Sequence, residues 1–169
     1  YKTFGPNFIK QPLEYFAAFK DMSIYSMQSL YYPETWKLFT GESVEDDRQK
    51  IIEYTKRLID IAAYIGCKIL VFGSPGLRFL NSQQSIDDQI SVFVTFLLTI
   101  SDYIITSDYD VTLCLENNAS AYNCNFLVTP EEVQGVLKKV NRENIGMVMD
   151  IGCLLMEGIS PLETLRTYG

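Results

Sequence analysis

The sequence contains no histidine among its 169 residues. A Ser-His-Asp triad, a Cys-His dyad, an HExxH zinc site and a histidine-based pH switch are therefore all excluded within this chain. Acid–base chemistry carried by these residues must use carboxylates, lysine, tyrosine or cysteine. Basic residues are also few, since 14 Lys and Arg stand against 21 Asp and Glu, a net charge of −7. This acidic balance argues against binding to nucleic acid or to an anionic membrane.

Cysteine pairs and long apolar runs are missing as well. The cysteines lie at positions 67, 114, 124 and 153, and no two of them form a CxxC pair that would suggest zinc or a redox dithiol. A chain of this size has no need of a disulfide scaffold, so we expect a reducing, cytoplasmic location. No uninterrupted apolar stretch reaches the ~20 residues of a membrane span. Because the chain begins with neither methionine nor a signal-peptide pattern, we expect it to be the middle of a longer protein.

What the sequence does contain is a regular alternation of strand and helix patterns. Apolar runs rich in β-branched and aromatic residues predict strands at 23–30, 68–73, 111–115 and 145–149. Helical periodicity and start signals predict helices at 12–20, 44–65, 85–107, 129–140 and from Ser160 onward. This order predicts one α/β domain, residues 1–169, with a parallel sheet. It does not distinguish an open doubly wound sheet from part of a (β/α)8 barrel.

Three of these helices carry the sequence signal of a capped start, and one of them is the last, in which Ser160 is followed by Pro161 and then by Glu163. Thr129 is followed by Pro130 and then by Glu132, which completes a capping box. Ser43 is followed three residues later by Asp46, a poorer partner than Glu for the same box. We expect all three hydroxyls to accept a hydrogen bond from the first helical turn.

Two carboxylates directly follow apolar strands. Glu116 comes after the strand predicted at 111–115, and Asp150 comes after the one at 145–149. In parallel α/β folds, functional groups gather beyond the carboxyl ends of the strands. Two such carboxylates could share a hard divalent ion or act as acid and base on a substrate. They could equally cap a helix or pair with Arg78, because structural ion pairs also occupy such positions.

Other groups near the strand ends allow either a functional or a structural interpretation. Arg78 could clamp an anionic substrate group or lie at the surface. The turn at 73–76 could hold a phosphate, but it lacks a P-loop ending and an ordinary turn explains it. An aromatic loop after the first strand could wall a pocket or pack across a barrel mouth. Its members are Tyr31, Tyr32, Trp36 and Phe39, and the asparagines that could bind sugar hydroxyls are Asn117, Asn118, Asn123 and Asn125.

Several segments along the chain are informative when they are taken together: SIYSMQSLYY with LFTG, KILVFGSP with Arg78, LCLENN with NFLVTPEEV, and GMVMDIGCLLMEG with PLETLRTYG. Together they resemble the xylose-isomerase-like TIM-barrel family of sugar-phosphate isomerases and epimerases. Their order and spacing match the family across nearly the whole chain, and the strand ending in Glu followed by one ending in Asp is the most specific part. The resemblance implies a (β/α)8 barrel of which this chain covers about the middle four βα units. The first two and last two strands would then be absent.

The resemblance also implies roles for individual residues. Glu116 matches a metal ligand that takes part in proton transfer, and Asp150 matches a second ligand of a divalent ion such as Mg²⁺, Mn²⁺, Zn²⁺ or Co²⁺. Cys153 stands where the family often has a substrate-contacting His, and Asn118 stands where some members carry a His. With Arg78, these two residues are the candidates for substrate binding. The remaining metal ligands of the family lie on the last two barrel strands.

The leading hypothesis from the sequence is a metal-dependent isomerase or epimerase of a sugar or sugar phosphate, acting by carboxylate-assisted proton transfer. The missing histidines motivate an alternative, a non-catalytic barrel that binds a ligand or a partner protein. A third hypothesis, an endonuclease of the same barrel superfamily, ranks last because it normally needs several histidine ligands and a basic face. We therefore expect a small-molecule partner, no nucleic acid or membrane partner, and a possible homo-oligomer.

Overall fold

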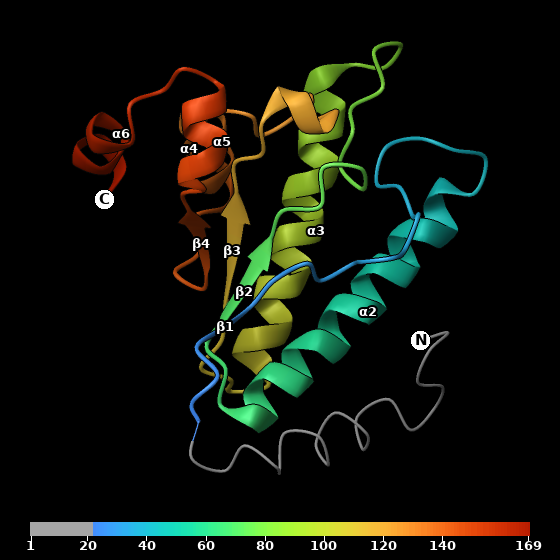
Figure 1. The fold of residues 1–169 in the computed structure, drawn as a ribbon. Coiled ribbons are helices and arrows are strands. Elements are labelled where there is room, and N and C mark those ends of the chain that lie inside the picture. Colours follow the sequence, from blue (N-terminus) through green and yellow to red (C-terminus); the bar gives the residue numbers. More distant parts are fainter. Residues whose placement is uncertain (1–21) are drawn as a thin grey trace.

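The structure, a computed structural model, describes residues 22–169 and contains one sheet of four parallel strands (Figure 1). The strands lie side by side in the order β1-β2-β3-β4. A doubly wound sheet reverses its strand order at a switch point, whereas a barrel segment keeps sequential order. The observed order is therefore that of a barrel segment. The strands are β1 (Ser26–Met27), β2 (Ile69–Phe72), β3 (Thr112–Glu116) and β4 (Ile145–Val148).

Helices form a layer against one face of this sheet. The three longest helices follow one another across the layer, with α2 beside α3 and α3 beside α4 (Figure 1). Their apolar sides meet the sheet in a single hydrophobic core. The helices are α2 (Val44–Ile65), α3 (Ile86–Thr106), α4 (Pro130–Val140), α5 (Ile151–Met156) and α6 (Pro161–Tyr168), with the short 3-10 helix η2 (Ser120–Tyr122).

Alternation along β3 separates the two faces of the sheet. Leu113 and Leu115 are completely buried beneath the helices and belong to the core. Cys114 points to the other face, since a Cβ placed on Gly146 of β4 would lie 3.3 Å from its sulfur. Glu116 falls on that same face because strand side chains alternate with a period of two. In a closed barrel this face lines the interior.

The helix α3 is long and apolar enough, by length and composition alone, to cross a membrane. The core helix of a globular fold can pass the same test. Here Phe93, Leu97 and Ile100 are completely buried in the core that covers the sheet. On the side of α3 that faces the core, packing within the domain thus accounts for the apolar residues.

The predicted elements differ from the structure mainly at the first strand. The strand predicted at 23–30 is wrong beyond Ser26–Met27, because Ser29 has a φ of 56° and turns the chain out of the sheet. Tyr32 then donates its backbone N–H to the Ser29 carbonyl at 3.2 Å. The other strands and the long helices start and end within one or two residues of their predicted bounds. The helix predicted at 12–20 lies outside the described residues.

Of the three predicted caps, two are confirmed, and one of these is at α6, where the Ser160 side chain accepts from the Glu163 backbone N–H at 3.4 Å. Thr129 and Glu132 form a complete capping box at α4, with each side chain bonded to the backbone of the other. Ser43 is the N-cap of α2, but its side chain makes no capping hydrogen bond, so the box predicted with Asp46 is wrong. Asp47 uses Oδ2 to accept from the Lys37 backbone instead, which ties the start of α2 to the preceding loop.

Candidate functional site

The carboxylate of Glu116 lies over the end of the neighbouring strand β2. The parallel register continues past Phe72 and Leu115, which brings Gly73 beside Glu116. A Cβ at Gly73 would lie only 2.3 Å from Glu116 Oε2 and 3.3 Å from Asn118 Oδ1. The missing side chain of Gly73 therefore makes the space in which the carboxylate lies.

Arg78 joins the ends of β2 and β3 from within the protein. Its guanidinium donates to the Gly73, Phe126 and Glu116 carbonyls at 2.7, 2.7 and 2.8 Å, and to Asn118 Oδ1 at 2.6 Å. The side chain is completely buried. Burial lowers the pKa of the guanidinium to about 10, so it remains charged at neutral pH. These four bonds engage Arg78 with the protein itself, so the predicted contact with a substrate anion does not fit this geometry.

Asp150 begins α5 and is held to the end of β3. Its Oδ1 accepts from the Cys153 backbone N–H at 2.9 Å and caps the helix. Its own backbone N–H donates to Asn117 Oδ1 at 3.2 Å. The helix-capping alternative from the sequence is therefore confirmed for Asp150, and a carboxylate oxygen can still accept from or bind a further group.

Asn117 links the two carboxylate-bearing strand ends. It directly follows Glu116 and is completely buried, and its Nδ2 has no hydrogen-bond partner among residues 22–169. A buried unpaired donor is uncommon in folded proteins and marks a place where a water or a bound group is expected to accept. The sequence pointed to Asn117 only as one of several loop asparagines, because its burial arises from the approach of β4.

The Cys153 thiol connects the two carboxylates electrostatically. The side chain is buried, and burial raises the pKa of the thiol, with further increases from the charges of Asp150 and Glu116. The thiol is therefore protonated at neutral pH and suits hydrogen bonding better than nucleophilic attack. The backbone of Cys153 is also held at this edge, because its N–H donates to Asp150 Oδ1.

The predicted site residues are thus brought together at the carboxyl ends of β2, β3 and β4. Glu116, Asp150, Asn118 and Cys153 all lie there, with Arg78 beneath them. Two members, Gly73 and Asn117, were not singled out for these roles by the sequence. For Gly73 the only signal was its position directly after an apolar strand.

Two other sequence interpretations resolve as structural. In the aromatic loop, Tyr31 and Phe39 are buried in the core, while Tyr32 is exposed and Trp36 packs edge-on against Tyr54. The loop therefore packs and does not wall a pocket as a unit. The Leu77 N–H donates to the Ser74 carbonyl at 3.1 Å, which closes an ordinary turn over 74–77 in the segment that was considered for phosphate.

The donor set at this edge fits a hard divalent cation in part. Carboxylate oxygens are the ligands that Mg²⁺ and Mn²⁺ prefer, and the space at Gly73 holds one of them in place. Within residues 22–169, no group of three or more His, Cys, Asp and Glu side chains is arranged to hold a metal. The two carboxylates therefore supply part of a coordination sphere.

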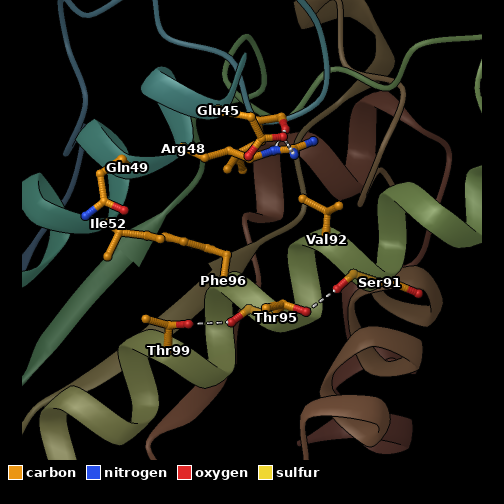
Figure 2. Close-up of a pocket in the computed structure, with 10 residues that line it drawn as sticks. Glu45, Arg48, Gln49, Ile52, Ser91, Val92, Thr95, Phe96 and Thr99 are labelled. Carbon is orange, nitrogen blue, oxygen red and sulfur yellow. Dashed lines mark hydrogen bonds and ion pairs between the residues drawn. The ribbon is translucent and has the colours of Figure 1, made fainter. Parts of the chain in front are cut away.

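A separate groove of about 390 Å³ lies in the helix layer between α2 and α3 (Figure 2). Its hydroxyl groups are already used, because Thr95 and Thr99 donate to the carbonyls of Ser91 and Thr95 at 2.8 Å. Arg48 pairs with Glu45 and also donates to the Leu38 carbonyl. The groove includes none of the predicted site residues, so it does not compete with the carboxyl-end site as a location for the predicted chemistry.

Comparison with solved structures shows the same fold in several proteins. A D-tagatose 3-epimerase-like protein superposes with a TM-score of 0.74 at 18% identity, covering 98% of this chain and 58% of that protein. The 3-keto-D-glucoside 4-epimerase YcjR from E. coli gives 0.72 at 14% identity, with coverages of 95% and 61%. The IolI protein with a bound zinc atom gives 0.66 at 21% identity, with coverages of 95% and 54%. The chain thus spans a little over half the length of these proteins.

The sequence itself gives the family. No curated protein matches it. A family model described as a xylose isomerase-like TIM barrel matches residues 12–167, which is nearly the whole chain. The sequential parallel strands with helices on one face agree with that description. The chain belongs to the xylose isomerase-like TIM barrel family.

Proposed function

We propose that this chain forms part of a metal-dependent isomerase or epimerase that acts on a sugar or sugar phosphate. The observation that carries the proposal is the Glu116 carboxylate, which is held over Gly73 at the end of β3 while Asp150 follows the adjacent strand. Sugar epimerases among the solved structures that share the fold support the choice of substrate class.

Glu116 and Asp150 would hold a divalent ion, which is Mg²⁺, Mn²⁺, Zn²⁺ or Co²⁺ in this proposal. The zinc atom bound to IolI, which shares the fold, supports a divalent ion as the cofactor. When bound, the ion would supply Lewis-acid polarisation of a substrate carbonyl and its neighbouring hydroxyl oxygen. Further ligands would come from outside the described residues.

The chain's own residues would bind and orient the substrate and move a proton. A carboxylate at Glu116 can accept a proton from the carbon next to a carbonyl and return it, which is the step that an isomerase or epimerase needs. Cys153 carries a neutral thiol at this edge and suits a polyol hydroxyl. The side chain of Asn118 is already engaged within the protein, because its oxygen accepts from Arg78 and its nitrogen donates to Glu116. Asn118 would therefore hold the Glu116 carboxylate in position and would not bind the substrate directly.

The test measures Mn²⁺ binding and solvent proton exchange with the full-length protein. We expect Glu116→Ala and Asp150→Ala each to weaken Mn²⁺ binding by at least about 100-fold, since loss of a ligand exceeds the effect of losing a residue that only orients one. Deuterium uptake from D₂O into a ketose substrate should fall in parallel. Asp110→Ala is the matched control, because Asp110 is an exposed carboxylate just before β3 that pairs with Lys68.

Unchanged Mn²⁺ binding and unchanged deuterium uptake in both variants would show that the site is wrong. Absence of metal and of proton exchange in the unmodified full-length protein would instead favour the alternative of a barrel that only binds a ligand or partner.

A further inference from the structure

Arg78, Asn118 and Glu116 form a chain of hydrogen bonds from the interior to the site. Arg78 donates to Asn118 Oδ1 at 2.6 Å, and Asn118 Nδ2 donates to Glu116 Oε2 at 2.8 Å. Asn118 is buried, and it separates a buried cation from the carboxylate. Its amide dipole therefore lies with the oxygen toward the positive charge and the N–H toward the negative one.

The orientation of the Asn118 amide follows from chemistry at its buried end. A guanidinium has only donors and no acceptor, so the group that faces Arg78 must be the amide oxygen. The amide nitrogen must then face Glu116 and donate to it. Hydrogen bonds to an ionised group are shorter and stronger than neutral ones, and bonds in a chain polarise one another. Arg78 thus determines that Asn118 is a donor to the carboxylate.

The remaining side of the carboxylate is bounded by the backbone of Gly73, directly after β2. Gly73 lies so close that its missing Cβ would overlap Glu116 Oε2. Glu116 Oε1, by contrast, has no hydrogen-bond partner within residues 22–169. The two oxygens of this carboxylate are therefore in different situations, one held by the protein and one available.

We propose that Arg78 and Asn118 form a positioning relay that assigns Glu116 Oε2 to the protein and presents Oε1 alone to the cation or substrate. The inference rests on the proposed function of Glu116 and adds two positioning residues to it. It also accounts for the complete burial of Arg78, which a residue that clamps a substrate anion at the surface would not require. Arg78 acts through Asn118 and contacts neither metal nor substrate.

The best variant for testing the relay is Asn118→Leu in the full-length protein. Leucine has a similar size but no polar atoms, so it can neither accept from Arg78 nor donate to Glu116. Arg78→Met is less suitable, because it also removes the donors to three backbone carbonyls. Asn125→Leu is the matched control, since Asn125 also makes two side-chain hydrogen bonds in the same region, both to the Leu80 backbone, and does not contact Glu116.

We expect Asn118→Leu to weaken Mn²⁺ binding by about 10- to 100-fold, the usual effect of losing a group that orients a metal ligand. Asn125→Leu should leave the affinity within a factor of two. Infrared difference spectra on Mn²⁺ addition give an independent signature. In the unmodified protein the carboxylate stretches of Glu116 should show one bound oxygen, and in Asn118→Leu they should shift toward two.

Equal Mn²⁺ affinity and equal infrared spectra in Asn118→Leu and Asn125→Leu would overturn the relay. The metal-free protein offers a separate check, because replacing Glu116 by Ala should move the side-chain amide signals of Asn118 in NMR spectra. If Glu116→Ala does not change Mn²⁺ binding, the proposed function fails, while this NMR shift still decides whether the relay exists. If Glu116→Ala abolishes Mn²⁺ binding and Asn118→Leu has no effect, only the relay fails.

Discussion

The two faces of β3 perform different tasks in this molecule. Leu113 and Leu115 are completely buried against the helix layer, where their neighbours are apolar. Glu116 on the opposite face ends the strand in a set of hydrogen-bonded polar groups. One residue of displacement along a strand is enough to change faces. The apolar face packs in the hydrophobic core, and the polar end of the strand positions the groups of the candidate site.

The polar groups at the strand ends are also different from the core in how they are stabilised. Core residues such as Phe93 make contacts with many apolar neighbours, so no single one specifies its position. The carboxylate of Glu116 is oriented by Asn118 on one side and bounded by Gly73 on the other. Substitutions in the core should therefore mainly lower stability, whereas substitutions around Glu116 should mainly weaken metal binding.

The largest effect on stability is expected from Phe93→Ala. Phe93 is completely buried, and its ring contacts Phe39, Phe72 and Phe126, so its loss should cost about 3–5 kcal/mol of unfolding free energy. Urea denaturation measures this cost. Tyr64→Ala is the control, since Tyr64 is exposed and its change should stay within about 0.5 kcal/mol. Similar costs for both would contradict the core assigned to α3.

A smaller effect on stability but a larger one on metal binding is expected from Gly73→Ala. The new Cβ would overlap Glu116 Oε2, the far end of a flexible side chain, so the carboxylate should move while the backbone stays. We expect Mn²⁺ binding, measured by calorimetry, to weaken by about 10-fold or more.

Gly135→Ala in α4 is the matched control for this glycine. Nothing lies within 4 Å of a Cβ at that position, so the variant should be more stable by about 0.5–1 kcal/mol with unchanged Mn²⁺ affinity. Unchanged affinity in Gly73→Ala would show that the position of the carboxylate does not matter for the metal.

The smallest expected effect comes from a helix start near the same edge. Thr129→Ala should lower the unfolding free energy by about 1 kcal/mol, because its hydroxyl caps α4. Ser43→Ala should change it by no more than about 0.5 kcal/mol, because Ser43 makes no side-chain cap. Thermal and urea unfolding measure both. Loss of Mn²⁺ affinity in Thr129→Ala would mean that metal binding at this edge depends on more than the Glu116 and Asp150 groups.

Long elements with a strong periodic pattern were predictable from the sequence. The helix at 44–65 was placed correctly because its apolar residues repeat at helical spacing over many residues. The strand at 68–73 was placed correctly because it is a continuous apolar run, which is also a local signal. The strand at 23–30 was overestimated, because Ser29, with a φ of 56°, turns the chain out of the sheet and Leu30 joins the core from the following loop. The helix α5 was missed because six residues are too few to establish a period.

The candidate site was predictable in its members but not in its connections. A carboxylate after an apolar strand is visible in the sequence, and Glu116 and Asp150 were found that way. The role of Arg78 was not visible, because its four acceptors come from residues as far apart in the chain as Gly73 and Phe126. The need for Gly73 was hidden for the same reason, since its neighbour in space is 43 residues away in the chain.

The sequence by itself determined the alternation of strands and helices, the absence of histidine chemistry and the two carboxylates at strand ends. These follow from composition and from periods of two and 3.6 residues, which are local properties. Only the tertiary structure decided the strand order, the capping role of Asp150 and which oxygen of Glu116 is available. Those depend on the register between strands that lie far apart along the chain, and the sequence of any one strand does not contain that register.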